Sequence, residues 1–326
     1  MKENNMKKKI LSALVMLIIT AVALTTATYA WFTENTTVQL AGLDVNVTAS
    51  NGIQISMDAV TWKASLTLED IRGTGIQYPT NVNQVPTTLV PVSSVGEMVD
   101  GKMKIFKGAI EFNTLGNQIV TAQPSVETAT NLTGDFIAFD IFVQTSQDET
   151  LYLLGTSDVV ASTTDKGLKN ASRIAFAYIG AVPTGSTPAE AQAITQTDAL
   201  DPVIWEPNSN LHTPAAVSNA AQFGEVITET QVLESYSGVS SIITTDDDVL
   251  LPYANATSNA SLFGTVTPTI KTVVGNGTTN TLLSLIGAGV HKVRVYAWVE
   301  GQDYDCENNA SGSNIMFNIG LSKNNS

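Results

Sequence analysis

The sequence predicts an all-β protein, a β-sandwich with short helices in inserted loops. Two observations lead to this expectation. Val, Ile, Thr, Phe and Tyr, which favour strands, are prominent, while charged residues make up only 14% of the chain. Clusters of Asn, Gly, Ser and Thr interrupt the chain at short intervals, as turns between short strands do. Many short strands separated by such turns are typical of a sandwich or a jelly roll, so a jelly-roll-like β-sandwich is expected.

The N-terminus has the pattern of an export signal. Four lysines lie among the first nine residues, an apolar run follows from Ile10 to Leu24, and small residues lead up to Ala30. This order is typical of a secretory signal, here with cleavage between Ala30 and Trp31. Residues 10–30 are also long enough to cross a bilayer, which takes about 20 apolar residues, so a retained anchor is the alternative. We expect residues 1–30 to be removed by a signal peptidase.

The remaining chain, 31–326, is strongly acidic. The first 30 residues hold four of the 16 basic and one of the 30 acidic side chains, which leaves 12 against 29 and a formal charge of −17. Nucleic acid and anionic lipids need a basic patch, so neither is expected as a partner; the membrane is contacted only through the N-terminal segment before cleavage. The single Cys306 cannot form an intramolecular disulfide. We expect 31–326 to fold as a single domain.

Two segments near the C-terminus alternate with the period of a strand. In residues 292–300, Lys292, Arg294, Tyr296, Trp298 and Glu300 would lie on one face. The opposite face would carry the apolar residues Val293, Val295, Ala297 and Val299. In residues 314–321 the inward residues would be Ile315, Phe317, Ile319 and Leu321. We expect these two strands to pair across the loop at 301–313.

Residues 135–143 are almost continuously apolar, which indicates a central strand covered on both faces. Residues 172–179 form another strand candidate, and 103–112 and 266–272 form weaker ones.

Helical signals are sparse. Thr187 and Pro188 begin the best predicted helix, because they fit the N-cap and the first helical position. Residues 213–221 and 280–286 are shorter candidates. Residues from about 181 to 250, rich in Pro, Ser, Thr and Asn, are interpreted as an inserted loop region on the sandwich.

Residues with catalytic potential are few. The chain has only two histidines, His212 and His291, and it contains no His-Glu-x-x-His zinc motif, no nucleophile elbow and no phosphate-binding glycine loop. We therefore expect a protein that is not an enzyme and that holds no cofactor. A peptidase would require His212 and His291 to converge with acidic residues in space.

Two acidic clusters could bind a hard cation such as Ca²⁺. One consists of Asp246, Asp247 and Asp248, and the other of Asp303, Asp305 and Glu307. Neither has the order of a calcium loop, so a solvated acidic turn is the favoured interpretation of both, with no metal site.

The first residues after the signal resemble the start of a known group of exported proteins. The segment Thr28-Tyr-Ala30 is followed by Trp31-Phe-Thr-Glu-Asn and by Thr37-Val-Gln-Leu-Ala-Gly-Leu-Asp-Val45. This pattern resembles the TasA and camelysin group of Firmicutes, which are Gram-positive bacteria. The resemblance implies export, a jelly-roll fold, and biofilm fibres in which the N-terminal segment of one subunit completes the sheet of the next.

Carried onto this chain, the resemblance makes the segment from Trp31 to about Leu40 the donor, with Trp31, Phe32, Val38 and Leu40 as its anchors. The alternative is that Val38–Val47 forms the first strand of its own sandwich. Camelysin has been described as a metallopeptidase, but that activity is not expected here because the zinc motif is missing.

The expected function is an exported structural protein of the cell surface or extracellular matrix, and the resemblance implies a fibre subunit that assembles with itself by N-terminal donor-strand exchange. The alternative is a monomeric surface adhesin or carbohydrate-binding module. That alternative requires Trp62, Trp205 or Trp298 to be exposed and grouped on a concave face.

Overall fold

The computed structural model describes eleven stretches of the chain. They are residues 38–47, 53–73, 78, 80–128, 132–161, 166–196, 201–222, 225–250, 261–273, 275–306 and 314–323, with only the backbone described for 38–47, 222 and 314. The expected cleavage site at Ala30 and Trp31, and the proposed anchor Phe32, lie outside the described residues. Within the described stretches, no helix is long and apolar enough to cross a membrane.

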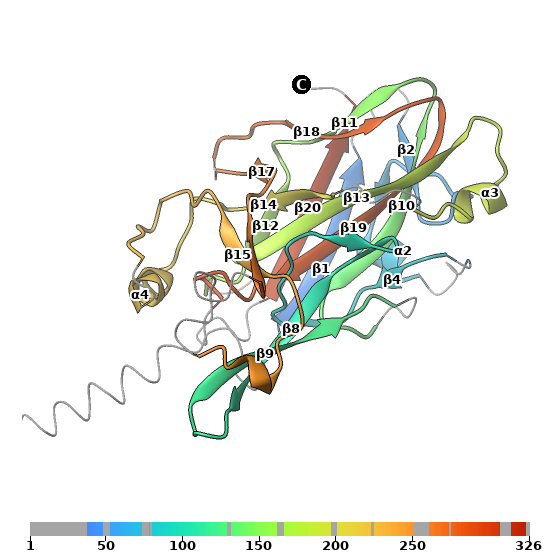
Figure 1. The fold of residues 1–326 in the computed structure, drawn as a ribbon. Helices are drawn as coiled ribbons and strands as arrows, with labels where there is room; N and C mark the ends of the chain where they lie inside the picture. The colour runs from blue at the N-terminus through green and yellow to red at the C-terminus, as the bar shows by residue number, and fades with distance from the viewer. Residues whose placement is uncertain are drawn as a thin grey trace, which may run out of the picture.

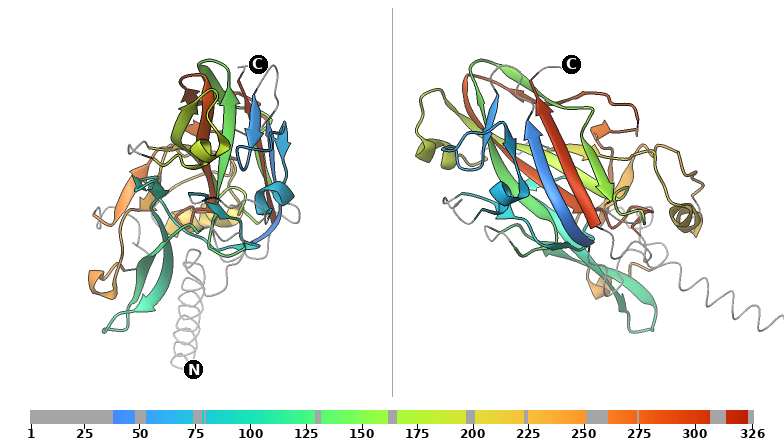
Figure 2. Two further views of the ribbon diagram at one scale, coloured as in Figure 1. Left: turned by 90° about the vertical axis from the view of Figure 1, so that its right-hand side faces the viewer. Right: turned by 180° about the vertical axis from the view of Figure 1, so that it is seen from behind.

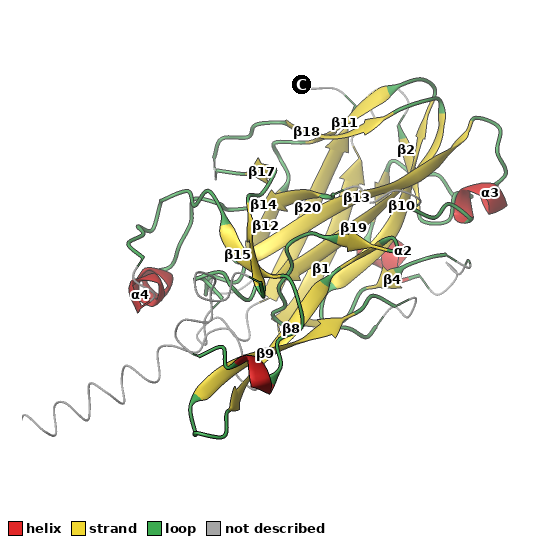
Figure 3. Ribbon diagram, in the orientation of Figure 1, coloured by secondary structure: helices red, strands yellow, loops and turns green. Residues whose placement is uncertain are grey.

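Strands dominate the fold, as the sequence predicts, and helices are few and short (Figure 3). One seven-stranded sheet, called sheet A here, contains the first and last strands of the described chain. Its central order is β18 (Asn280–Leu285), β11 (Glu149–Leu153), β20 (Asn314–Ser322), β1 (Val38–Val47) and β3 (Ser65–Leu66). In addition, β12 (Asp158–Ala161) pairs with β20, and β5 (Thr88–Leu89) pairs with β1.

A second seven-stranded sheet, sheet B, packs against sheet A (Figures 1 and 2). Its order is β17 (Ile270–Lys271), β14 (Val203–Glu206), β13 (Ser172–Pro183), β19 (Gly289–Val299), β10 (Ile137–Thr145) and β2 (Gln54–Ser56). A short strand, β4 (Asn83–Gln84), also pairs with β10. The long strands β13, β19 and β10 are antiparallel neighbours and form the centre of this sheet.

The main core fills the space between the two sheets. The predicted inward faces of β19 and β20 both contribute to it, for example through Val295 and Phe317, so the predicted faces of these two strands are confirmed. The predicted pairing of the two strands is wrong, because β19 lies in sheet B and β20 in sheet A. Alternation fixes which face of a strand is apolar, but it does not identify the neighbouring strand.

Sheet B is buried on both faces. Its outer face carries a second core, in which Phe142 of β10 and Trp298 of β19 pack with Met103, Ala191 and Ile194. Part of the covering layer comes from β6 (Met98–Val99), β7 (Lys102–Met103) and α3 (Pro188–Gln192). The prediction that residues 135–143 form a doubly covered central strand is therefore confirmed.

A long hairpin extends from the sandwich. It consists of β8 (Ile105–Phe112) and β9 (Gln118–Ser125), so the weak strand prediction at 103–112 is confirmed (Figure 1). The hairpin packs against a two-stranded sheet of β15 (Tyr236–Val239) and β16 (Phe263–Val266). Phe106, Val120 and Phe263 belong to the small third core between them.

The helices agree only partly with the sequence-based expectations. Helix α3 begins after Thr187, as predicted, and the side chains of Thr187 and Glu190 form a capping box there. Helix α4 (Pro214–Gln222) matches the candidate at 213–221, and two further one-turn elements are α2 (Leu68–Arg72) and η1 (Thr245–Asp247). The helix predicted at 280–286 is wrong, because these residues form β18 and pair with β11.

The region interpreted as an insertion, about 181–250, contributes to the sandwich as well as to its surroundings. Strand β14 pairs with β13 and extends sheet B, whereas α3, α4 and β15 lie outside both large sheets.

Candidate functional site

The predicted assembly residues Val38 and Leu40 lie in β1, which pairs with β20 of its own chain. The two strands are parallel, with eight registered pairs from Gln39 opposite Asn314 to Val47 opposite Leu321. The first and last described strands of the chain are therefore neighbours, visible as the blue and red arrows in the right panel of Figure 2. In this structure the strand completes its own sheet, which is the arrangement of the alternative interpretation.

The other edge of β1 has only short partners. Val38 and Gln39 pair with β5, and Val45 and Asn46 pair with β3. Among the described residues, the stretch 40–44 has no ladder partner on this edge. Most of the backbone pairing that holds β1 therefore comes from β20, in a parallel ladder, which is slightly less stable per residue than an antiparallel one.

The first acidic cluster is an exposed turn. Asp247 accepts hydrogen bonds from the backbone N–H and the hydroxyl of Thr244, and Asp248 accepts one from the Asn113 side chain. Asp246, Asp247 and Asp248 are all exposed. This agrees with a solvated acidic turn.

The second acidic cluster is not a solvated turn, so that interpretation is wrong for it. Asp303 forms an ion pair with Arg173 at 2.6 Å, and Asp305 is fully buried beside the His212 ring at 2.7 Å. Glu307 lies outside the described residues. In the part of the chain that the structure describes, no group of three or more His, Cys, Asp or Glu side chains could hold a metal ion.

The two histidines contact separate sets of residues. Besides Asp305, His212 contacts the backbone carbonyl of Gln231. His291 contacts the hydroxyls of Thr145 and Tyr178 and the carbonyl of Gly287. The convergence that a peptidase would need is therefore not observed.

Their environments also shift the two histidine pKa values in opposite directions. Burial alone would lower the pKa of His212, but the hydrogen bond and charge of Asp305 outweigh it, so this pKa lies above its ordinary value. Burial lowers the pKa of His291. His212 is thus the histidine that carries a proton more readily.

The tryptophans do not form an exposed binding platform. Trp205 and Trp298 have no exposed surface, and their indole N–H groups donate to Thr272 and Glu300. Trp62 is half-buried and packs against the second core. A carbohydrate-binding face built from these three rings is therefore not present.

Charged residues are concentrated on the outer face of sheet B, beneath the covering layer. Asp140 of β10 is the cross-strand partner of Arg294 of β19, and its two carboxylate oxygens accept from the guanidinium at 2.6 and 3.2 Å. Lys292, two residues before Arg294, lies 3.2 Å from the same carboxylate. Burial lowers the pKa of Lys292, and Asp140 opposes this effect.

Glu127 extends this cluster from the segment after β9. Its Oε1 accepts from the Tyr296 hydroxyl at 3.1 Å and lies 3.4 Å from Arg294. Its Oε2 is buried and has no hydrogen-bond partner among the described residues. Burial raises the pKa of this carboxyl.

A second buried cluster surrounds Arg173 of β13. This guanidinium forms ion pairs with Glu206 at 2.8 Å and with Asp303, and it lies 4.9 Å from the centroid of the Tyr236 ring. Nearby, burial raises the pKa of Glu300 to about 7. Sequence reasoning identified Arg294 and Glu300 only as the polar face of a strand and did not identify them as buried.

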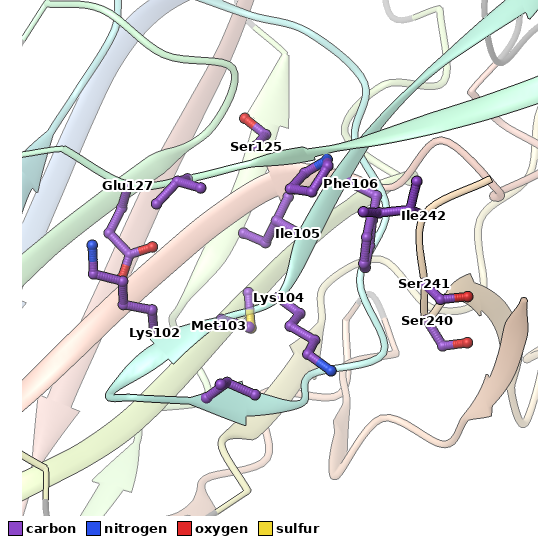
Figure 4. A pocket seen from close by; sticks show the side chains of 13 residues that line it. Lys102, Met103, Lys104, Ile105, Phe106, Ser125, Glu127, Ser240, Ser241 and Ile242 are labelled. Atoms are coloured by element: carbon purple, nitrogen blue, oxygen red, sulfur yellow. The ribbon is translucent and has the colours of Figure 1, made fainter. Parts of the chain in front are cut away.

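An apolar groove of about 530 Å³ lies between the start of the β8–β9 hairpin and the segment after β15 (Figure 4). Most of its walls are apolar side chains, among them Met103, Ile105, Phe106 and Ile242. A separate polar cavity of about 380 Å³ lies beside it, and both are lined by Lys102 and Glu127. Nothing in the sequence pattern indicated the groove or the cavity, because the residues that line them come from loops and strand ends.

Comparison of the chain with protein-family models, with curated proteins and with solved structures gave no match.

Proposed function

We propose that this chain is an exported structural subunit of the cell surface or extracellular matrix, and that it assembles by exchange of β1 between copies. The observation that carries the proposal is the position of β1. It precedes every other described strand, yet it lies inside sheet A, where its main partner is β20.

A strand in this position can be exchanged without passing another part of the chain through the fold. If β1 leaves, β20 loses eight registered backbone pairs and presents an open edge next to the core residues of sheet A. The β1 of a second copy carries the same sequence, so it restores the same pairs and the same register. Exchange therefore costs little once the strand has left.

Exchange of this kind is head-to-tail. Each copy donates β1 and accepts a strand beside β20, so the donating and accepting surfaces differ, and contacts of this type continue into an open filament unless the rotation closes a ring. The acidic composition and the export-type N-terminus are consistent with a soluble subunit that assembles outside the cell. The membrane is then contacted only through the segment before cleavage.

The experiment is a disulfide test of which copy supplies β1. Asp44 and Asn318 are Cα partners across the β1–β20 ladder. Neighbouring strands lie about 4.8 Å apart, within the range of about 4.4–6.8 Å between Cα atoms that a disulfide needs. The variant Asp44→Cys/Asn318→Cys is expressed with its signal, collected from the medium and oxidised. We expect filaments in electron micrographs and a covalent ladder of oligomers on a non-reducing gel.

The single variants Asp44→Cys and Asn318→Cys are the matched controls, because each keeps only one of the two new thiols. The native Cys306 is buried and common to all three proteins. Filaments that yield only covalent monomers would show that β1 stays in its own chain and would exclude strand exchange. A secreted chain that remains monomeric would exclude the structural-subunit proposal itself.

A further inference from the structure

The apolar groove beside the β8–β9 hairpin has exposed walls. Val99, Val126 and Ile242 line it and are 41%, 56% and 47% exposed. They come from three separate segments, and they are three of the ten large apolar side chains that are exposed among the described residues. In Figure 4, Ile242 lies beside Phe106, which is almost fully buried. Exposed apolar side chains that gather in one place mark an interaction site, whereas scattered ones do not.

The direction of β1 leads toward this groove. Strands β1 and β5 are antiparallel, with Val38 opposite Leu89, so the chain before Val38 continues in the same direction as the chain after Leu89. The next residue, Val90, donates its backbone N–H to the carbonyl of Asp135. The Asp135 carboxylate in turn accepts from the hydroxyl of Ser125, which lines the groove. The strand direction at Val38 therefore leads to the Ser125 end of the groove.

The segment ahead of β1 is also long enough to reach it. Summed over the neighbours just described, Val38 lies at most about 25 Å from Ser125. A chain of the length of residues 31–37 spans about 25 Å when it is extended. Side chains at the far end of this segment can therefore contact the groove.

The composition of this segment suits the groove. Residues 31–37 begin with Trp31 and Phe32, and they contain one acidic residue, Glu34, and no basic one. The two aromatic side chains match the apolar walls. The charged side chains that line the groove are Lys102, Lys104 and Glu127, so their net charge is opposite to that of the segment.

We propose that the groove is the docking site of residues 31–37 and that the pair Trp31 and Phe32 packs against its exposed apolar walls. The segment stays joined to β1 whichever copy supplies that strand. In a single chain it covers the chain's own groove, and after strand exchange it covers the groove of the accepting copy. This docking therefore does not require strand exchange, and a failure of one proposal leaves the other standing.

The test is the reactivity of a thiol placed on the groove wall. Val126→Cys is expressed with its signal, collected from the medium and labelled with a water-soluble maleimide, with and without the further change Trp31→Ser/Phe32→Ser. We expect labelling at least about tenfold faster without the two aromatic residues, since burial of one large apolar side chain stabilises a contact by roughly that factor or more. The native Cys306 is buried and common to all variants.

The matched control is Ile286→Cys, because Ile286 is also a large apolar residue and is exposed. Ile286 follows β18 and lies past the C-terminal end of β20, whereas Val38 lies at the start of that strand. Residues 314–322 alone span about 26 Å, so the segment cannot reach Ile286. The thiol at position 286 should react equally fast with and without the aromatic pair.

Equal labelling of Val126→Cys in the two backgrounds would overturn the proposal. A parallel acceleration at Ile286→Cys would also overturn it, because the aromatic substitutions would then loosen the whole fold. Protection that survives these substitutions and disappears on dilution would assign the groove to a second copy.

If the serine variant is not exported, the double variant Thr33→Cys/Val126→Cys replaces it. A disulfide between these two positions, mapped by mass spectrometry after oxidation, supports docking. A yield no higher than that of Thr33→Cys/Ile286→Cys excludes it.

Discussion

Asp140 and Arg294 face each other across the β10–β19 ladder and form a two-point ion pair that is buried beneath the covering layer of sheet B. Such a pair is held by strand register rather than by flexible loops. Lys292 also contacts Asp140, so one carboxylate pairs with two buried cations, and Glu127 lies 3.4 Å from Arg294 as a second acid. Asp140 is therefore the acidic side chain that the two buried cations share.

Replacing Asp140 by leucine should be among the most destabilising single changes in the domain. The substitution leaves Arg294 and Lys292 buried without their shared carboxylate, and removing one partner of a buried ion pair costs about 3–5 kcal/mol. Urea unfolding followed by circular dichroism measures the loss. A cost near that of a surface substitution, below about 0.5 kcal/mol, would contradict the arrangement.

Arg294→Met should cost less than Asp140→Leu, because Asp140 keeps Lys292, the Tyr78 hydroxyl and the backbone N–H of Val82. Asp246→Leu is the surface control, since Asp246 lies in the exposed turn. The expected order of cost is Asp140, then Arg294, then Asp246. An inverted order for the first two would mean that Asp140 is not the shared counter-ion.

The fold class and several strands could be predicted because their signals are local. The apolar run at 135–143 and the alternation at 292–300 correctly indicated a doubly covered strand and an apolar inner face. The pairing of strands depends instead on contacts between distant segments. For that reason the sequence suggested a hairpin of β19 and β20, whereas these strands lie in different sheets.

The burial of the charged residues on sheet B was harder to predict, because it too depends on segments that are distant in sequence. The alternation around Arg294 looks like an exposed polar face, and it becomes a buried one only because segments distant in sequence, among them β7 and α3, cover sheet B. Asp140, a lone acid within an apolar run, was the one local signal of a buried pair. Glu127 and Gln196 lie outside regular periodic segments, so no pattern pointed to the cavity.

Glu300 should make stability depend on pH. Burial raises its pKa in the folded protein to about 7, above the ordinary value of 4.5, so the folded state holds this proton more tightly than the unfolded state does. Its contribution is therefore fully present below pH 4.5 and is lost as the pH rises through about 7. Relative to Glu300→Gln, the wild type should lose stability over this window.

The measurement is the free energy of unfolding of both proteins at several pH values between 4 and 8. Other groups titrate in this range, but they are common to both proteins and cancel in the difference. A difference that stays constant across the series would show that Glu300 has an ordinary pKa.

The two histidines should titrate at different pH values, although the ordinary pKa of a histidine side chain is the same for both. Asp305 raises the pKa of His212, and burial lowers that of His291. Protonated His212 therefore contributes stability that is fully present below about pH 6.5 and is lost as the pH rises through its folded pKa. NMR titration of the two imidazole rings checks both directions in one sample.

The resonances are assigned with His212→Gln and His291→Gln, one at a time. Asp305→Asn then removes the charge beside His212 and should lower the pKa of that ring while leaving His291 unchanged. If His291 retains its proton to higher pH than His212, the assignment of Asp305 as the dominant partner fails.

Gly155→Ala should destabilise the fold because two loops approach each other there without room for a side chain. A Cβ atom at position 155 would lie 1.7 Å from the backbone oxygen of Gly277, and the obstruction is backbone that cannot rotate away. We expect a loss of about 1–3 kcal/mol in the free energy of unfolding, as for other overpacked positions.

Gly116→Ala separates this steric effect from backbone strain, because Gly116 has a φ of +80° and nothing within 4 Å of its Cβ position. The Gly116 variant should lose about 1 kcal/mol, from conformation alone. A smaller loss for Gly155→Ala than for Gly116→Ala would show that the loop carrying Gly277 moves aside easily, and that the close contact does not help to fix this end of sheet A.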